Sequence, residues 1–205
     1  MNTRIKICGI TRPQDALAAA DLGADAIGLV FFSGSKRAVD VAQAQAVVRA
    51  LPPLVSAVGL FVNADAAEVA AVLQQVPLDV LQFHGDETAA FCRQFARPYI
   101  KAVRVAAAAD IDAAARDFTD ARALLLDAAV PGQYGGTGQR FDWQLLPAHI
   151  PMPWLLAGGL DADNVAQAIA QSRAVAVDVS GGVESAPGIK DAAKMAAFIR
   201  QARGG

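Results

Sequence analysis

The sequence predicts a (β/α)8 barrel, the α/β fold in which eight parallel strands alternate with eight surrounding helices. Short runs rich in β-branched and aliphatic residues alternate with alanine-rich segments from one end of the chain to the other. Several of the apolar runs lack strict alternation, which is typical of strands covered by protein on both faces. Eight such units in 205 residues lie near the lower size limit of this fold.

The individual elements follow from this rhythm. Strands are expected at 4–8, 26–31, 55–61, 80–83, 99–103, 123–127, 154–157 and 174–179. Helical patterns lie between and after them at 13–23, 40–51, 64–76, 86–96, 110–118, 141–146, 161–172 and 189–203. No linker or change in composition marks a second domain, so we expect residues 1–205 to form one barrel domain.

A doubly wound open sheet is the alternative architecture. It usually needs fewer strands, and the first strand here is not followed by the G-x-G-x-x-G turn of dinucleotide-binding sheets. The barrel is therefore favoured.

Composition narrows the classes of function. Apolar residues make up 54%, charged residues 19%, and the net charge is −2. Lys and Arg are scattered, which argues against nucleic acid as a partner, and the apolar runs are too short to span a membrane. Two cysteines and an N-terminus unlike a signal peptide favour a cytoplasmic protein. No heptad or long apolar stripe decides between a monomer and a homodimer.

Polar residues and glycines gather where the strands end. In a (β/α)8 barrel the active site is built at the carboxyl ends of the strands and in the loops that follow, so these residues form one candidate set. The set comprises Cys8, Ser35, Arg37, Asn63, Gln82, His84, Arg104, Asp127, Gly158, Gly159, Ser180, Gly181 and Gly182.

Two glycine pairs, in "LAGGLDADN" and "DVSGGVES", follow the last two strands. Glycine allows backbone N–H groups to approach a ligand closely, and barrels often hold a phosphate in these two loops. Tight turns alone would explain one pair, but two pairs in adjacent loops favour a phosphate site.

Cys8 and Asp127 are candidates for a catalytic base and acid. We expect their strands, the first and the sixth, on opposite sides of the closed barrel, which would place the two groups across a substrate. A lone cysteine is more often a small core residue. That interpretation suits Cys92, on the apolar face of a helix, better than it suits Cys8 beside Gly9.

Charged and polar neighbours complete the candidate site. Arg37 could hold a carboxylate with its planar fork, although a solvated loop arginine is the simpler interpretation. Gln82 and His84 should share one face of the fourth strand, and each could instead be structural. Lys6 and Asp178 should form an interior ion pair between neighbouring strands, because either charge buried alone would cost about 3 to 5 kcal/mol.

The strand-end motifs resemble the phosphoribosylanthranilate isomerase family over nearly the whole chain. The resemblance rests on "KICGIT", "GADAIGLVFFSGSKR", "VGLFVN", "LQFHGDE", "LLLDA", "YGGTGQRFDW", "LAGGLDADNV" and "VDVSGGVESAPGIKD", in this order. One departure is that Lys36 stands where the family typically has proline, so Arg37 is expected to be less preorganised.

The resemblance implies an Amadori rearrangement of N-(5-phosphoribosyl)anthranilate, a small sugar phosphate, in tryptophan biosynthesis. It implies Asp127 as general acid, Cys8 as general base and Arg37 as the anthranilate carboxylate ligand. Gln82, His84 and Ser180 would contact substrate, and the glycine loops would hold its phosphate. No metal or organic cofactor is expected. The loop at 128–143 is long and glycine-rich, which fits a lid, although a solvated loop would look similar.

Three rivals remain at this point. Resemblance to indole-glycerol-phosphate synthase would call for a catalytic lysine at a strand end, and the histidine-pathway isomerase for aspartate at position 8, so Cys8 disfavours both. A barrel that only binds a metabolite would have no use for an acid and a base facing one pocket.

Overall fold

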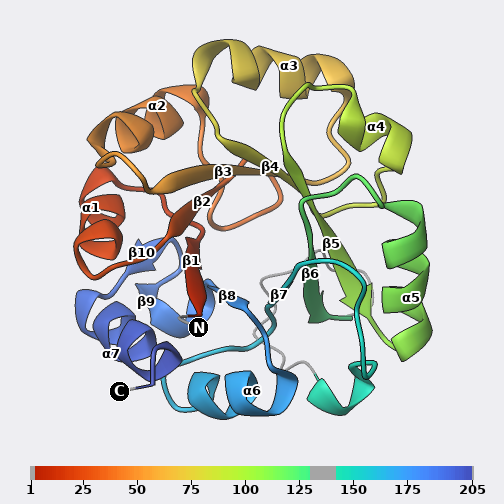
Figure 1. Ribbon diagram of the computed structural model, residues 1–205. Helices are drawn as coiled ribbons and strands as arrows, with labels where there is room; N and C mark the ends of the chain where they lie inside the picture. Colours follow the sequence, from red (N-terminus) through yellow and green to blue (C-terminus); the bar gives the residue numbers. More distant parts are fainter. Residues whose placement is uncertain (1–2, 130–141, 205) are drawn as a thin grey trace.

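A computed structural model describes residues 3–129 and 142–204 and contains the predicted barrel. Each strand pairs in parallel with the next, and the eighth pairs with the first, so the sheet closes. Figure 1 shows the helices arranged around these strands. The strands are β1 (Arg4–Cys8), β2 (Ala26–Val30), β3 (Ser56–Phe61), β4 (Val80–Phe83), β5 (Tyr99–Val105), β6 (Ala123–Ala128), β7 (Trp154–Leu156) and β8 (Ala176–Val179).

The helices begin where the sequence provides a start signal. Asp40 and Asp65 each form a capping box, and Pro13 occupies the start of the first helix, where its missing N–H is not needed. The helices are α1 (Pro13–Asp21), α2 (Val41–Ala50), α3 (Ala66–Gln75), α4 (Ala89–Arg93), α5 (Ala108–Asp117), α6 (Val165–Ser172) and α7 (Ala192–Ala202), with a short 3-10 helix η1 (Trp143–Leu145) before β7.

A small hairpin between β8 and α7 was not predicted. After a 3-10 turn η2 (Gly181–Val183), strands β9 (Glu184–Ala186) and β10 (Ile189–Lys190) pair in antiparallel. The helix expected at 189–203 therefore begins only at Ala192, where the Asp191 side chain accepts a hydrogen bond from the Lys194 N–H.

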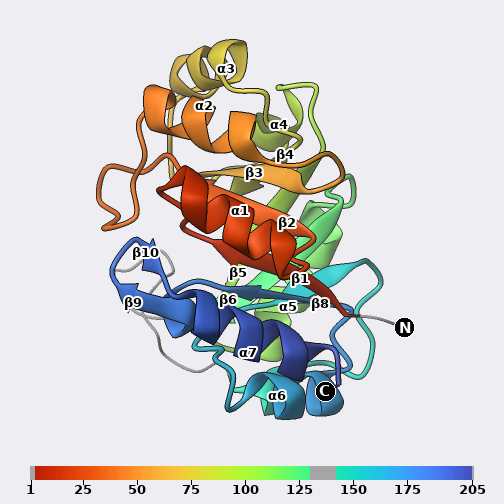
Figure 2. The ribbon, with the colours of Figure 1, turned by 90° about the vertical axis from the view of Figure 1, so that its left-hand side faces the viewer.

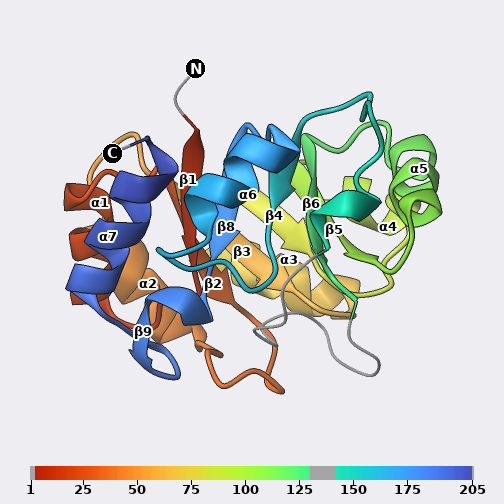
Figure 3. The same cartoon turned by 90° about the horizontal axis from the view of Figure 1, so that it is seen from below.

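The hairpin lies at one end of the barrel. Figure 2 shows β9 and β10 at the same end as the loop that joins β2 to α2, and Figure 3 shows both at the end away from the N-terminus. This is the end at which the barrel strands terminate, so the last βα unit and the second one meet at the barrel mouth.

The barrel interior is apolar on one side and charged on the other. Ile100, Ala102, Ala123, Leu125 and Ala157 form a compact interior cluster. On β1 and β8 Lys6 pairs in register with Asp178 and its ammonium lies 2.7 Å from that carboxylate, which confirms the predicted ion pair. Both side chains are buried.

Two further findings concern the described residues alone. Within residues 3–129 and 142–204, no helix is long and apolar enough to cross a membrane, and no three His, Cys, Asp or Glu residues gather as a metal site would require. Most of the loop predicted to be a lid, at 128–143, lies outside the described residues.

Candidate active site

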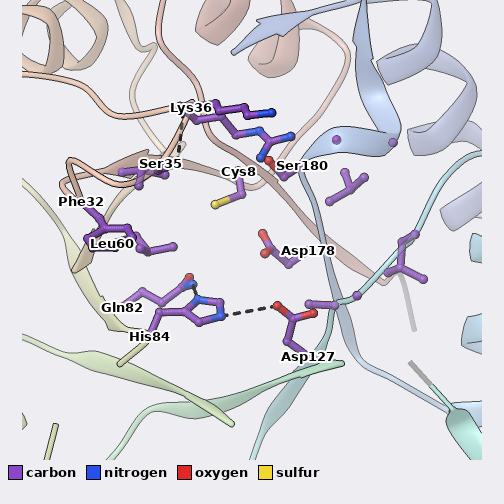
Figure 4. Close-up of a pocket in the computed structure, with 18 of the residues that line it drawn as sticks. Cys8, Phe32, Ser35, Lys36, Leu60, Gln82, His84, Asp127, Asp178 and Ser180 are labelled. Atoms are coloured by element: carbon purple, nitrogen blue, oxygen red, sulfur yellow. Dashed lines mark hydrogen bonds and ion pairs between the residues drawn. The ribbon is translucent and has the colours of Figure 1, made fainter. Parts of the chain in front are cut away.

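One pocket of about 910 Å³ opens at the carboxyl ends of the barrel strands. Its walls come from both glycine loops, from the loop after β2 and from the ends of the strands, as Figure 4 shows. The residues predicted for the site that line this pocket are Cys8, Ser35, Arg37, Gln82, His84, Asp127, Gly158, Gly159, Ser180, Gly181 and Gly182.

Asn63 and Arg104, also considered from the sequence, do not line the pocket. The Asn63 side chain accepts a hydrogen bond from the Asp86 N–H, and Arg104 forms an ion pair with the Asp86 carboxylate. Both residues therefore bind the loop after β4 instead of a ligand.

Cys8 and Asp127 reach the same open space from different strands (Figure 4). The strand order corrects one detail of the prediction: only β8 and β7 separate β1 from β6 on the shorter path around the barrel, so the two strands are not diametrically opposite. The thiol and the carboxyl still line one pocket, which a single small substrate could span.

Asp127 accepts a backbone hydrogen bond and lies at the end of a short row of side chains formed with His84 and Gln82. One carboxylate oxygen accepts the backbone N–H of Ala128 at 2.8 Å, and the other lies 3.4 Å from Nε2 of His84. Nδ1 of His84 lies 3.0 Å from Nε2 of Gln82. Because an amide NH2 group only donates, Nδ1 is the acceptor in this arrangement, which leaves Nε2 as the ring nitrogen able to carry an N–H toward Asp127.

Cys8 is buried beside a cation and beside a glycine that sequence reasoning missed. A Cβ on Gly28 would lie 2.7 Å from the Cys8 sulfur and 3.1 Å from the Lys6 nitrogen. Because Gly28 has no side chain, β2 leaves room at this position for the Cys8 sulfur and the Lys6 ammonium. Burial raises the pKa of the Cys8 thiol above its ordinary value, and the positive charge of Lys6 offsets only part of that effect.

Arg37 is held by Glu184, another residue that sequence reasoning missed. Nε and Nη2 of Arg37 donate to the two carboxylate oxygens of Glu184, each at 2.7 Å, and Lys190 donates to Glu184 at 2.9 Å. Burial alone would raise the pKa of Glu184, but the bonds from Arg37 and Lys190 outweigh burial and hold it below its ordinary value.

The contacts of Arg37 change two expectations: how it could hold a carboxylate, and how well ordered it is without a proline at position 36. One edge of its guanidinium fork already serves Glu184, so a ligand carboxylate would meet the remaining N–H groups. The backbone N–H of Arg37 also donates to the Ser35 hydroxyl at 3.1 Å. Arg37 is thus fixed by contacts that do not depend on a proline at position 36.

The two glycine loops lie against one another at the pocket wall. Gly158 and Gly159 have φ angles of 84° and 62°, in the left-handed region that favours glycine. A Cβ on Gly182 would collide with the carbonyl oxygen of Leu160. Glycine is therefore required at position 182 for the two loops to come this close, and glycine at 158 and 159 suits the left-handed backbone of the first loop.

An apolar wall faces these polar groups and was also missed. Val30, Leu60 and Val62 form a buried cluster with Cys8, and Phe32 packs against it. A signal was present in the sequence, since Val30 and Phe32, like Leu60 and Val62, are two residues apart at the ends of neighbouring strands.

Comparison with known proteins assigns a family to this site. The family model described as N-(5'-phosphoribosyl)anthranilate (PRA) isomerase matches residues 5–201. The chain belongs to this family. The N-(5'-phosphoribosyl)anthranilate isomerase of Pseudomonas putida strain KT2440 is 61% identical over 199 residues, which are 97% of each chain.

Solved structures of PRA isomerases share the fold closely. The crystal structure of the Thermotoga maritima enzyme is 40% identical, with a TM-score of 0.90 over 98% of this chain and 99% of that one. A PRA isomerase crystallised with reduced 1-(o-carboxyphenylamino)-1-deoxyribulose 5-phosphate is 37% identical, with a TM-score of 0.84 over the same shares.

Proposed function

We propose that this protein isomerises N-(5'-phosphoribosyl)anthranilate to 1-(2-carboxyphenylamino)-1-deoxyribulose 5-phosphate, a step of tryptophan biosynthesis, and that residues 1–205 act as one catalytic unit. Membership in the PRA isomerase family supports the reaction. The observation that carries the mechanism is that Cys8 and Asp127 line one pocket together with Arg37 and both glycine loops.

In the first step Asp127 acts as general acid. It gives a proton to the ribose ring oxygen, the bond from that oxygen to C1 breaks, and the lone pair of the anthranilate nitrogen forms a C=N iminium bond. Asp127 is then a carboxylate. The N–H of His84, which faces the outer carboxylate oxygen at 3.4 Å, supports that charge as it forms.

In the second step the thiolate of Cys8 removes the proton from C2. The electrons of that C–H bond form a C1=C2 double bond, and the iminium nitrogen becomes neutral. The resulting enolamine becomes the ketone when C1 gains a proton and the C2 hydroxyl loses one. A moderate base suffices, because the neighbouring iminium makes the C2 proton acidic.

The pocket offers a matching surface for each part of this substrate. The apolar wall of Val30, Phe32, Leu60 and Val62 suits the aromatic ring, and Arg37 suits the carboxylate on that ring. Backbone N–H groups around Gly159 and Gly181, with Ser180, suit the phosphate. Gln82 Oε1 is buried in the pocket wall and has no hydrogen-bond partner among the described residues, so it suits a sugar hydroxyl.

Purified protein given synthesised phosphoribosylanthranilate tests this proposal. The fluorescence of the anthranilate compound should fall with time in proportion to enzyme concentration. A rate equal to the background would contradict the function and leave a metabolite-binding barrel as the better interpretation.

We also propose the cytoplasm as its compartment, because a catalytic thiol must stay reduced and both cysteines are free.

Arg37→Met should raise KM about 10- to 100-fold and change kcat little. The loss corresponds to one charge-assisted hydrogen-bonded contact to the substrate carboxylate, on the order of 1.5 to 3 kcal/mol. Steady-state kinetics measure the effect, and phosphoribosylaniline, which lacks the carboxylate, provides the matching substrate change. The wild-type protein should bind this analogue as weakly as Arg37→Met binds the normal substrate.

Arg104→Met is the matched control, because this second strand-end arginine does not line the pocket. Its KM should stay within about 2-fold of wild type, as expected for a surface substitution away from the ligand. If both arginine variants raised KM equally, Arg37 would have no specific part in binding.

Gly28→Ala should lower kcat/KM about 10-fold or more and destabilise the fold by about 1 to 3 kcal/mol, because the new methyl would displace the Cys8 sulfur. Denaturant unfolding and kinetics measure the two effects. Gly59→Ala is the control, since its methyl would meet the side chain of Leu78 instead. We expect it to lose stability and keep its turnover; an equal loss of turnover would make the Gly28 effect one of folding only.

A further inference from the structure

The thiol of Cys8 is in an environment that opposes its proposed role. A general base must be ionised, yet Cys8 is only 5% exposed and borders an apolar cluster. Burial disfavours the charged form of a thiol. Some group near the sulfur must therefore compensate the negative charge of the thiolate.

Lys6 is the charged group placed to do this. It lies two residues before Cys8 on β1, so both side chains point into the barrel. The site that a Gly28 Cβ would occupy is 2.7 Å from the sulfur and 3.1 Å from the Lys6 nitrogen, which places both atoms around one small space. Lys6 is 3% exposed and does not line the pocket, so it lies beneath the thiol and out of reach of a substrate.

We propose that Lys6 is a positioning residue for Cys8: its ammonium, anchored by Asp178, is the fixed cation beside which the catalytic thiolate forms. The Asp178 carboxylate holds the ammonium at 2.7 Å and belongs to the neighbouring strand in register. This inference extends the proposed function, because it concerns the same base.

Other charges also face the thiol and must be considered. Lys190 on β10 and Arg37 in the loop after β2 are cations that also attract a thiolate at Cys8. Both donate to the carboxylate of Glu184, whose negative charge offsets part of theirs. Asp178 opposes ionisation from β8. Among these charges, Lys6 lowers the pKa of Cys8 the most, by more than Asp178 raises it or Lys190 lowers it.

The proton balance of this arrangement is simple. When Cys8 ionises, its proton passes to solvent, and Lys6 keeps its charge because Asp178 and the thiolate both favour the ammonium. When the thiolate takes the C2 proton, the sulfur becomes neutral again and Lys6 is unchanged. Lys6 thus transfers no proton itself; it lowers the free energy of the thiolate before and during the reaction.

The test is a titration of the thiolate by its ultraviolet absorbance, without substrate. All variants carry Cys92→Ala, so that Cys8 is the remaining cysteine. The same titration of a variant that also carries Cys8→Ala is subtracted, which removes the absorbance of the tyrosines. Lys6→Gln/Asp178→Asn replaces the ion pair with two amides. In that variant the midpoint of Cys8 ionisation should rise by about one pH unit or more, and the rising limb of kcat/KM, which requires the ionised base, should move with it.

A second buried pair provides a matched control. Lys101, within β5, lies 3.0 Å from Glu87, in the loop between β4 and α4, and both are buried and do not line the pocket. Lys101→Gln/Glu87→Gln removes an ion pair of the same kind, so a purely structural role predicts equal effects. Equal midpoints in the two double variants, or no rise with Lys6→Gln/Asp178→Asn, would overturn the inference.

Two measurements keep the inference testable if that double variant does not fold. Lys6→Arg retains the charge and should keep the wild-type midpoint. In the wild-type chain, the nuclear magnetic resonance signal of the Lys6 ammonium should shift at the midpoint of the thiolate absorbance, and Cys8→Ala should abolish that shift. A Lys6 signal indifferent to Cys8 ionisation contradicts the inference. Because neither measurement needs turnover, their failure is distinct from failure of the proposed isomerase activity.

Discussion

Cys8→Ala is expected to lower kcat about 100- to 10,000-fold while the fold and KM change little. Alanine removes the proposed base, and the iminium formed by ring opening then has only water to take its C2 proton. The change also deletes a small buried side chain, so unfolding must be measured beside kinetics. A folded variant with near-normal turnover would show that another group is the base.

Cys92→Ala is the matched control for this experiment. Cys92 is a buried cysteine on α4 that does not line the pocket, and burial raises its pKa to about 12. Its replacement should reduce stability and leave kcat within about 3-fold of wild type. Loss of turnover in Cys92→Ala but not in Cys8→Ala would contradict the assignment directly.

Asp127→Asn is expected to produce a loss of similar size, about 100- to 10,000-fold in kcat. The amide keeps the shape of the side chain and can still accept the Ala128 N–H, but it has no acidic proton for the ribose ring oxygen. Single-turnover kinetics should show that ring opening has become the slow step. The pH profile should also lose the limb that requires an acid.

Asp25→Asn changes a carboxylate at the other end of the barrel, where it accepts the Ile5 N–H and pairs with Arg4. We expect its turnover to stay within about 2-fold of wild type. If Asp127→Asn behaved in the same way, ring opening would need no contribution from Asp127.

The sequence was sufficient to predict the barrel and most of the pocket for a physical reason. Both faces of each strand are covered, so the strands read as short apolar runs, and β1 and β4 begin and end where those runs do. Closure then brings the carboxyl ends of all strands together, so residues distant in the sequence could be grouped before any distance was known.

The features that could not be predicted depend on contacts between residues distant in the sequence, or on space left by a glycine that has no side chain. Glu184 lies 147 positions from Arg37, in a hairpin whose strands are too short to show a period. Gly28 drew no attention in the sequence, and only coordinates show that its vacant side-chain position accommodates a sulfur and an ammonium. Arg104 failed as a candidate because it pairs with Asp86 and does not line the pocket.

The contacts of Lys6 with Asp178 and of Arg37 with Glu184 both join the first fifth of the chain to its last fifth. During synthesis on the ribosome, Lys6 and Arg37 emerge early, but their partners Asp178 and Glu184 are added more than 140 residues later. Catalytic competence should therefore arise only after β8 and the hairpin that follows it have been synthesised, with no active nascent form that lacks them.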